Sequence, residues 1–457
     1  MHDGAPHPTR IEPAKVSLAT RPLTIPEVVK KARNNVLEIV PALACRQPML
    51  TGVTVKRWHM VMDPPSLERI LKDKVDAYPK SPVTKRLLKP AIGESLFIAE
   101  GSHWRWQRRA AAPVFAWRHL QALSPVMTAA AERSAARIGE EMERKGRVEA
   151  YEQMIAATFD VICDVALSGR ETLDRDHVSN SINSYIETVG KVSFLDVIGV
   201  PTWVPRPATL FRRRSSDDMR KMMDGVIAER AGQGSRDDLL DLMRFAEDAE
   251  TGRTMTAEEL RDNMLAFIVA GHETTALALA WSIYLLAIDP ATQEAAREEA
   301  LAATGGGAAE AGHLDALDLT GRVLEEALRL YPPAAFLARI ALEDDKLCGR
   351  PIKKDDILML PIYALHRHHM WWEDPDAFDP SRFTAATAKG RHRYQYLPFG
   401  AGPRICIGMG FALMEAKLIL ATLLTRYRFA LVGDHPEPAI TLTLRPRGGV
   451  NVTATPI

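Results

Sequence analysis

The sequence predicts one large, mainly helical domain with a small β region. Helical periodicity dominates from Leu120 to about Leu330, a much longer stretch than any strand pattern covers. The strand signals are short and lie before and after this stretch. No internal repeat and no shift in composition divides the chain, so residues 1–457 are expected to form a single domain.

The first 50 residues contain no identifiable motif. They show neither the basic and then apolar pattern of a signal peptide nor a long apolar run, so we expect no N-terminal membrane anchor. The chain has only four cysteines and no CxxC pair, which argues against a disulfide framework and predicts a cytoplasmic location. These cysteines are Cys45, Cys163, Cys348 and Cys406.

Four short segments predict strands. Residues 53–62 alternate imperfectly between apolar and polar side chains, and residues 356–360 form a brief second candidate. Residues 440–444 and 450–453 flank Arg-Pro-Arg-Gly-Gly and predict a C-terminal hairpin. Two loose segments, 201–207 and 302–311, predict surface loops.

A long apolar helix is predicted near the middle of the helical stretch. Thr256 and Glu259 have the spacing of a capping box, and Asp289-Pro290 ends the pattern. The apolar part, residues 264–288, contains Glu273, which would cost roughly 3 kcal/mol in a membrane span. We therefore favour the buried central helix of a large protein.

Residues 399–408, with the sequence FGAGPRICIG, form the strongest local pattern. Its glycines permit unusual backbone conformations, and Cys406 precedes a predicted helix, 409–424, whose dipole favours a thiolate. Arg404 adds a positive charge for a nearby anion, and Phe399 could cover the sulfur. A lone cysteine is more often an inert buried thiol. The combination instead favours a thiolate that binds a soft metal ion.

This segment resembles the haem-binding loop of the cytochrome P450 superfamily, FxxGxRxCxG, and every fixed position matches. The resemblance implies the cytochrome P450 fold of a soluble, bacterial-type member, with haem b as the cofactor. It assigns Cys406 as the axial ligand of the iron and Arg404 as a partner of a haem propionate. A thiolate ligand favours cleavage of the O–O bond.

Further matches follow in family order. Residues 270–275, AGHETT, are similar to the oxygen-activation motif, which assigns proton delivery to Glu273 and Thr274. Taken alone, Glu273 could be a surface group, but its flanks are apolar on both sides. His272 and Thr275 are interpreted as structural. Arg339 and the Trp104–Arg108 pair resemble the propionate-binding positions of the family, whereas Glu326, Arg329 and Arg382 resemble its structural ExxR and PxRF elements.

The resemblance implies a monooxygenase that inserts one oxygen atom of O2 into a hydrophobic small molecule and releases the other as water. We expect a monomer that receives electrons from a ferredoxin and ferredoxin reductase or equivalent donors. A peroxygenase or a haem gas sensor are the alternatives, and both are disfavoured by Glu273-Thr274. The substrate pocket is expected to involve residues 81–97, 194–211 and 265–274.

Charge patterns add two hypotheses. The net charge is zero, so nothing indicates a nucleic-acid partner, and an electron donor must be steered by a local patch. His366, His368 and His369 lack nearby ligand-type residues and predict a solvated loop rather than a metal site. The basic residues expected near the cysteine side of the haem are Arg105, Arg108, Arg109, Lys389, Arg391 and Arg393.

Overall fold

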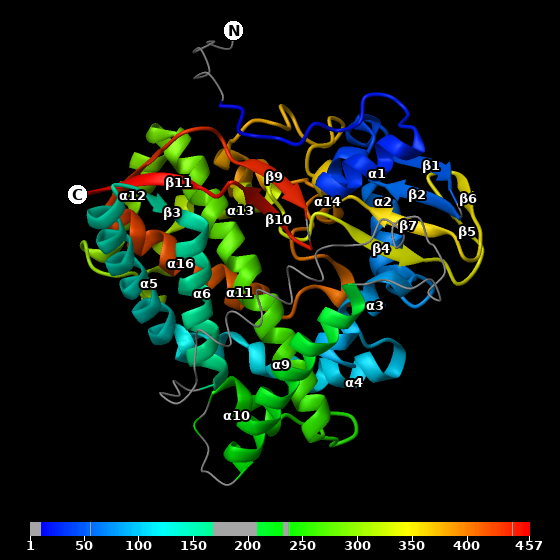
Figure 1. Ribbon diagram of the computed structural model, residues 1–457, viewed down its shortest axis with the longest axis horizontal. Coiled ribbons are helices and arrows are strands. Elements are labelled where there is room, and N and C mark those ends of the chain that lie inside the picture. Colours follow the sequence, from blue (N-terminus) through cyan, green and yellow to red (C-terminus); the bar gives the residue numbers. More distant parts are fainter. Residues whose placement is uncertain (1–10, 55, 168–207, 232–235, 237, 441) are drawn as a thin grey trace.

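The computed structural model describes residues 11–54, 56–167, 208–231, 236, 238–440 and 442–457. A helical body surrounds one long helix, α11, and a small sheet lies at one side (Figure 1). The helices are α1 (Ile25–Asn34), α2 (Pro64–Glu68), α3 (Pro82–Ile92), α4 (Gly101–Ala111), α5 (Trp117–Lys145), α6 (Ala150–Leu167), α9 (Ala208–Ala231), α10 (Leu239–Arg244), α11 (Ala257–Ile288), α12 (Pro290–Thr304), α13 (Asp318–Leu330), α14 (Ile362–Leu365), α15 (Ala385–Ala388) and α16 (Met409–Arg426).

Small sheets complete the fold, as predicted. β2 and β7 run parallel in the four-stranded sheet β1-β2-β7-β4, and its other pairs are antiparallel. The strands are β1 (Met49–Val53), β2 (Arg57–Val61), β3 (Val148–Glu149), β4 (Leu337–Ile340), β5 (Asp345–Leu347), β6 (Arg350–Ile352), β7 (Ile357–Leu360), β8 (Tyr427–Leu431), β9 (Glu437–Ile440), β10 (Leu444–Arg447) and β11 (Asn451–Pro456).

The central helix has the predicted ends. The Thr256 hydroxyl accepts a hydrogen bond from the Glu259 amide at 3.2 Å, and the Glu259 carboxylate accepts one from the Thr256 amide at 3.0 Å. α11 is long and apolar enough to cross a membrane, but 78% of its most apolar window is buried inside the protein. It packs against α6, α9, α13 and α16, as the core helix of a large domain does.

The C-terminal strands differ from the prediction. β9 pairs with β10, whereas β11 pairs with β3 and β8 in a separate sheet, so residues 440–453 do not form one hairpin. Gly448 and Gly449 have φ of 85° and 74° and carry the chain from one sheet to the other. Residues 53–62 were predicted as a single strand candidate. They contain the end of β1 and the whole of β2, which pair as an antiparallel hairpin.

The N-terminal segment without a motif is docked on buried tyrosines. The Val16 amide donates to the Tyr363 hydroxyl at 2.9 Å, and the Ala14 amide donates to Tyr284 at 2.9 Å. The Tyr331 hydroxyl donates to the Ala14 carbonyl at 2.6 Å. These bonds satisfy backbone groups that no regular element pairs, which fixes the segment on the body.

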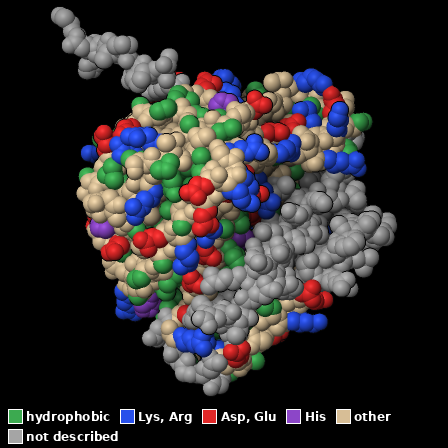
Figure 2. All heavy atoms as spheres, turned by 60° about the vertical axis from the view of Figure 1, so that its left-hand side comes forward, with side chains coloured by type: hydrophobic (Ala, Val, Ile, Leu, Met, Phe, Trp, Pro, Cys, Tyr) green, Lys and Arg blue, Asp and Glu red, His purple; other side chains and the backbone are tan. Residues whose placement is uncertain are grey.

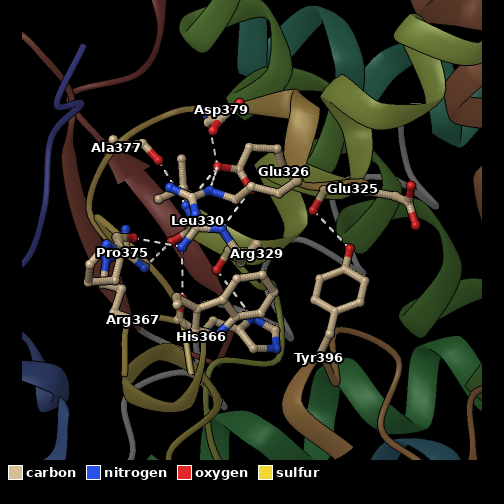
Figure 3. A network of polar contacts seen from close by, with 12 residues as sticks. Glu325, Glu326, Arg329, Leu330, His366, Arg367, Pro375, Ala377, Asp379 and Tyr396 are labelled. Carbon is tan, nitrogen blue, oxygen red and sulfur yellow. Dashed lines mark hydrogen bonds and ion pairs between the residues drawn. The ribbon is translucent and has the colours of Figure 1, made fainter. Parts of the chain in front are cut away.

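The expected structural network of Glu326, Arg329 and Arg382 is present, and Figure 3 shows Glu326 and Arg329 within it. Glu326 and Arg329 are fully buried, and the Arg329 Nε donates to the Glu326 carboxylate at 2.6 Å. The Arg382 Nε lies 3.3 Å from Glu326 Oε1. Arg329 also donates to the carbonyls of residues 366, 375 and 377. The network therefore ties α13 to the segment that precedes the cysteine loop.

The prediction of a solvated histidine loop was wrong. His366 and His368 are completely buried, and only His369 is exposed. His366 accepts the Leu397 amide at Nε2 (2.8 Å) and contacts the Arg329 carbonyl through Nδ1 (3.2 Å). Burial and the nearby Arg329 charge lower the pKa of His366 to about 3, so the ring is neutral at neutral pH.

Acidic and basic side chains are interspersed on the face that Figure 2 shows. This mixed surface agrees with 58 basic and 58 acidic residues in the sequence. Residues 302–304 of the predicted loop 302–311 belong instead to α12, which ends where Gly305 adopts a left-handed conformation. The other predicted loop, 201–207, lies outside the described residues.

Candidate active site

The cysteine loop is a tight turn that precedes α16. Gly402 has φ of 68°, and a Cβ on it would lie 2.0 Å from the Leu71 carbonyl oxygen, so only glycine fits there. The Cys406 amide donates to the Phe399 carbonyl at 2.9 Å, which closes the loop. Phe399 is half-buried and contacts Cys406 through its backbone carbonyl. Gly408 has an ordinary φ of −87° and open space around its Cα.

Cys406 is exposed, although protein surrounds its thiol. Burial is the largest influence and raises the pKa of the thiol, whereas the Gly408 amide and the Arg108 charge lower it. The expected depression of the thiol pKa is therefore wrong for the protein alone, because desolvation outweighs the local positive potential. A sulfur that is both surrounded by protein and exposed lines an internal recess. A metal ion there would deprotonate the thiol.

One face of α11 also lines open space. Ala270 is exposed, and Phe267 and Thr274 are only partly buried, although the helix around them is buried. These residues are three and four positions apart and so share one helix face. The Thr274 hydroxyl donates to the Ala270 carbonyl at 2.8 Å, as expected for a mid-helix threonine. A Cβ on Gly271 would make only an ordinary contact, 3.5 Å from Ile162.

Glu273 lies on a different face of α11 and is not hydrogen-bonded to Thr274. Its Oε1 accepts from the Arg445 Nε at 2.5 Å, the Thr443 hydroxyl at 2.9 Å and the Tyr151 hydroxyl at 3.2 Å. Its side chain is 3% exposed. Neither a surface carboxylate nor a direct Glu273–Thr274 relay, both considered from the sequence, matches this geometry.

Three cations from separate elements meet around one carboxylate. Arg404 forms an ion pair with Glu100 and donates to the Ala99 carbonyl at 2.9 Å. Burial, followed by the charges of Arg404 and Arg339, lowers the pKa of Lys80 to about 7. Burial and the Arg404 charge lower the pKa of Arg339 to about 10. This cluster has an excess of positive charge and suits a ligand with anionic groups.

Trp104 and Arg108 lie one turn apart on α4, as expected. Trp104 is buried, and the Arg404 guanidinium lies 4.4 Å from the centre of its ring. Burial lowers the pKa of Arg108, which is half-buried near Cys406. Within the described parts of the chain, no ion pair to a carboxylate neutralises Arg108. Arg108 thus adds a further positive charge near Cys406.

The cytochrome P450 family profile matches residues 28–453, which is nearly the whole chain. The chain belongs to the cytochrome P450 family. P450 relatives occur in plants, mammals and bacteria, so the similarity does not single out a bacterial type. Cytokinin hydroxylase of Arabidopsis thaliana is 33% identical over 81% of this chain and 73% of its own. Cyclooctatin synthase of Streptomyces melanosporofaciens is 31% identical over 82% of this chain and 79% of its own.

Other P450 proteins agree in sequence and in fold. Cytochrome P450 4A6 of Oryctolagus cuniculus is 30% identical over 87% of this chain and 81% of its own. The haem domain of cytochrome P450DA superposes with a TM-score of 0.79 at 26% identity and covers 90% of each chain. The expectations of a P450 fold and a haem-thiolate monooxygenase are therefore confirmed.

The residues of this P450 fit haem. A soft sulfur is exposed within the protein at Cys406, and an excess of buried positive charge at Lys80, Arg339 and Arg404 suits the two carboxylates of a porphyrin. Among the described residues there is no cluster of three or more His, Cys, Asp or Glu that could hold another metal ion.

Sequence reasoning missed three polar residues of the site. Lys80 and Arg445 carry no local motif, because their partners come from distant segments. Glu415 on α16 is fully buried, burial raises its pKa well above the usual range, and it hydrogen-bonds to Thr275. A single acid within the apolar run of α16 was the only available signal for Glu415.

Several of the basic residues that were predicted to form a docking surface have partners within the protein. Arg109 pairs with the buried Asp248 at 2.6 Å, and the Arg391 guanidinium lies over the rings of Trp372 and Phe383. Arg105 is exposed but pairs with Asp76 at 2.5 Å. Contacts within the protein therefore involve part of the positive charge that was predicted, from the sequence alone, to face a partner. Lys389 and Arg393 are exposed.

Proposed function

We propose that this P450 binds haem b through Cys406 and uses O2 to oxidise a hydrophobic small molecule. Haem supplies the iron that activates oxygen, with a thiolate ligand that favours O–O cleavage. The observation that carries the proposal is that Cys406 is exposed although protein surrounds it, in a loop directly before α16, which packs against α11. The carboxylates of haem would be held by Arg404, Arg339 and Arg108, together with Trp104 and Lys80.

Side chains of α11 would bind the substrate and deliver protons. Thr274 presents a hydroxyl on the recess side of the helix, and Glu273 is the nearest acid along the chain. Phe267, which packs edge-on against Phe115 with ring centres 5.2 Å apart, and Ala270 contribute apolar surface. Such a wall favours a hydrophobic substrate. Of the other segments expected to line the pocket, 194–207 lies outside the described residues.

The electron donor we propose is a ferredoxin with its reductase. Lys389 and Arg393 leave positive charge exposed, which suits an acidic protein. Charge reversal of both should slow reduction of the iron and weaken its salt dependence. An unchanged rate at low salt would exclude this surface. We also propose a cytoplasmic monomer. Only four cysteines in the sequence, without a CxxC pair, fit a reducing compartment, and light scattering of the purified protein would check its mass.

The variant Cys406→Ser tests the ligand assignment. The reduced, carbon-monoxide-bound wild type should show the thiolate-type spectrum, and the serine variant should lose it, because a hydroxyl is a poor ligand for this iron. Cys163→Ser, at a buried cysteine, should retain the spectrum. A thiolate spectrum in Cys406→Ser would overturn the assignment. Equal product yield from peroxide alone, without an electron donor, would indicate a peroxygenase instead.

A further inference from the structure

Two buried side-chain amides connect residues 93–98, the segment between α3 and α4, with the first turns of α11. Gln107 lies on α4 and Asn263 lies on α11, and both are completely buried. The Asn263 Nδ2 donates to the Gln107 Oε1 at 2.9 Å, so the two amides bind each other directly. We call Gln107 and Asn263 the amide clamp.

The amide clamp holds the backbone of residues 93–98 at two points. The Leu96 amide donates to the Asn263 Oδ1 at 2.9 Å, and the Gln107 Nε2 donates to the Glu94 carbonyl at 3.0 Å. Asp262, next to Asn263, accepts the Glu94 amide at 3.0 Å. Residues 93–98 belong to no helix or strand, so these side chains take the place of regular backbone pairing.

Every polar group of the two amides has a partner. Besides the bonds above, the Asn263 Nδ2 donates to the Glu259 carbonyl at 2.8 Å, and the Gln107 Nε2 lies 2.9 Å from the His103 Nε2. Both oxygens accept a hydrogen bond, and each nitrogen has two partners, which is the full capacity of an amide. A fully satisfied buried network fixes one arrangement, because a displacement leaves a polar group without a partner.

Phe97 is the exposed residue of the segment that the clamp holds. It is 44% exposed, whereas its neighbours Leu96 and Ile98 are buried. The Lys80 Nζ lies 5.7 Å from the centre of the Phe97 ring, and Lys80 belongs to the positively charged cluster beside the recess. Phe97 therefore adjoins the recess, and the amide clamp fixes the backbone that carries it.

We propose that Gln107 and Asn263 are positioning residues that limit the width of the recess at Phe97. They hold the backbone on the N-terminal side of Phe97, so a broad ligand can push this residue outward only if hydrogen bonds of the clamp break. The proposal rests on the proposed function, since the hydrophobic substrate would bind in this recess. It adds that the clamp selects narrow substrates over broad ones.

Two variants open the clamp, and a third is a matched control. Asn263→Leu and Gln107→Met remove an amide at nearly constant volume. Gln293→Met does the same on α12, where the buried Gln293 donates to the carbonyls of residues 286 and 429. The probes are imidazole and the broader 4-phenylimidazole, which bind the same iron and are titrated by the change in the haem spectrum.

Both clamp variants should bind 4-phenylimidazole about tenfold more tightly, relative to imidazole, than the wild type does. This is the size of effect expected when the broad ligand no longer has to break a hydrogen bond. Gln293→Met should keep the wild-type ratio, although the loss of its hydrogen bonds also lowers the unfolding temperature.

Hydrogen exchange tests the clamp without ligand or catalysis. Amides of residues 93–98 should exchange several-fold faster in both clamp variants, because Leu96 or Glu94 loses its partner. The double variant should exchange no faster than the faster single variant, because the two amides act as one unit. Wild-type exchange in both single variants would overturn the proposal.

The probe titrations have equally definite readings. A wild-type probe ratio in both clamp variants, with only a lower unfolding temperature, would show a merely structural network and overturn the proposal. A wild type that binds no haem would refute the proposed function, while hydrogen exchange would still decide on the clamp. If the clamp variants do not fold, Asn263→Asp and Gln107→Glu, which keep the acceptor oxygen and lose the donor, carry the same comparisons.

Discussion

The sequence pattern predicts the structural role of Gly402 but gives no indication of the role of Lys80. Gly402 lies in a motif, and the structure gives its physical reason: a left-handed backbone pressed against the Leu71 carbonyl. Lys80 lies in no motif. Its role depends on Arg339 and Arg404, which are distant from it in the sequence. Local backbone constraints leave a local signature, whereas electrostatic clusters do not.

The variant Gly402→Ala should be strongly destabilised. Its Cβ would lie 2.0 Å from a backbone carbonyl that cannot move like a flexible side chain, and φ is 68°. We expect a loss of at least about 2 kcal/mol in the free energy of unfolding, from strain and overpacking together. Urea unfolding measures it. Gly312→Ala, with open space around the new methyl group, should change stability by less than about 0.5 kcal/mol.

At the scale of elements, two ion pairs on α13 have similar spacing but contribute differently to stability. Glu326–Arg329 and Asp318–Arg322 both join residues one turn apart on this helix. The first pair is fully buried and also satisfies backbone carbonyls of the following segment, whereas Asp318 is 73% exposed. Only the buried pair links α13 to the chain that leads into the cysteine loop.

Arg329→Met should therefore cost about 3–5 kcal/mol, because it leaves Glu326 buried without its main partner. Arg322→Met should cost less than about 1 kcal/mol, as is usual for exposed pairs. Comparing their denaturant midpoints checks the prediction. Similar midpoints for the two variants would mean that the buried network is not what holds α13 in place.

Considered as a whole molecule, the protein should lose stability in acid partly through His366. Its pKa is 6.5 in an unfolded chain and about 3 in the folded protein. Between these values the unfolded chain binds more protons at this site, so the free energy of unfolding falls as pH falls from 6.5 to 3. The slope from this site approaches about 1.4 kcal/mol per pH unit. Glu325, whose pKa burial raises to about 7, opposes this trend above pH 4.5.

His366→Gln isolates this contribution. The variant should be less stable near neutral pH, because it loses hydrogen bonds to Leu397 and Arg329, yet its stability should fall less steeply between pH 6.5 and 3. Denaturant unfolding at a series of pH values gives both slopes. His392→Gln, at an exposed histidine, is the control and should change the stability near neutral pH by less than about 0.5 kcal/mol. A parallel curve for His366→Gln would contradict the assignment.

The sequence by itself determined the features that depend on neighbours along the chain. Capping residues defined the ends of α11, the glycine-rich loop identified Cys406, and the family resemblance ordered the remaining motifs. Each depends on backbone geometry or on a helix face, which only a few residue types satisfy.

Only the tertiary structure decided which distant groups meet. It buried His366, placed β11 in a different sheet from β10, used Arg391 for packing and turned Glu273 toward Arg445. Burial and charge pairing depend on segments far apart in the sequence, and these set the pKa of a thiol or the partner of a carboxylate. No local sequence pattern predicts which of these distant segments come into contact.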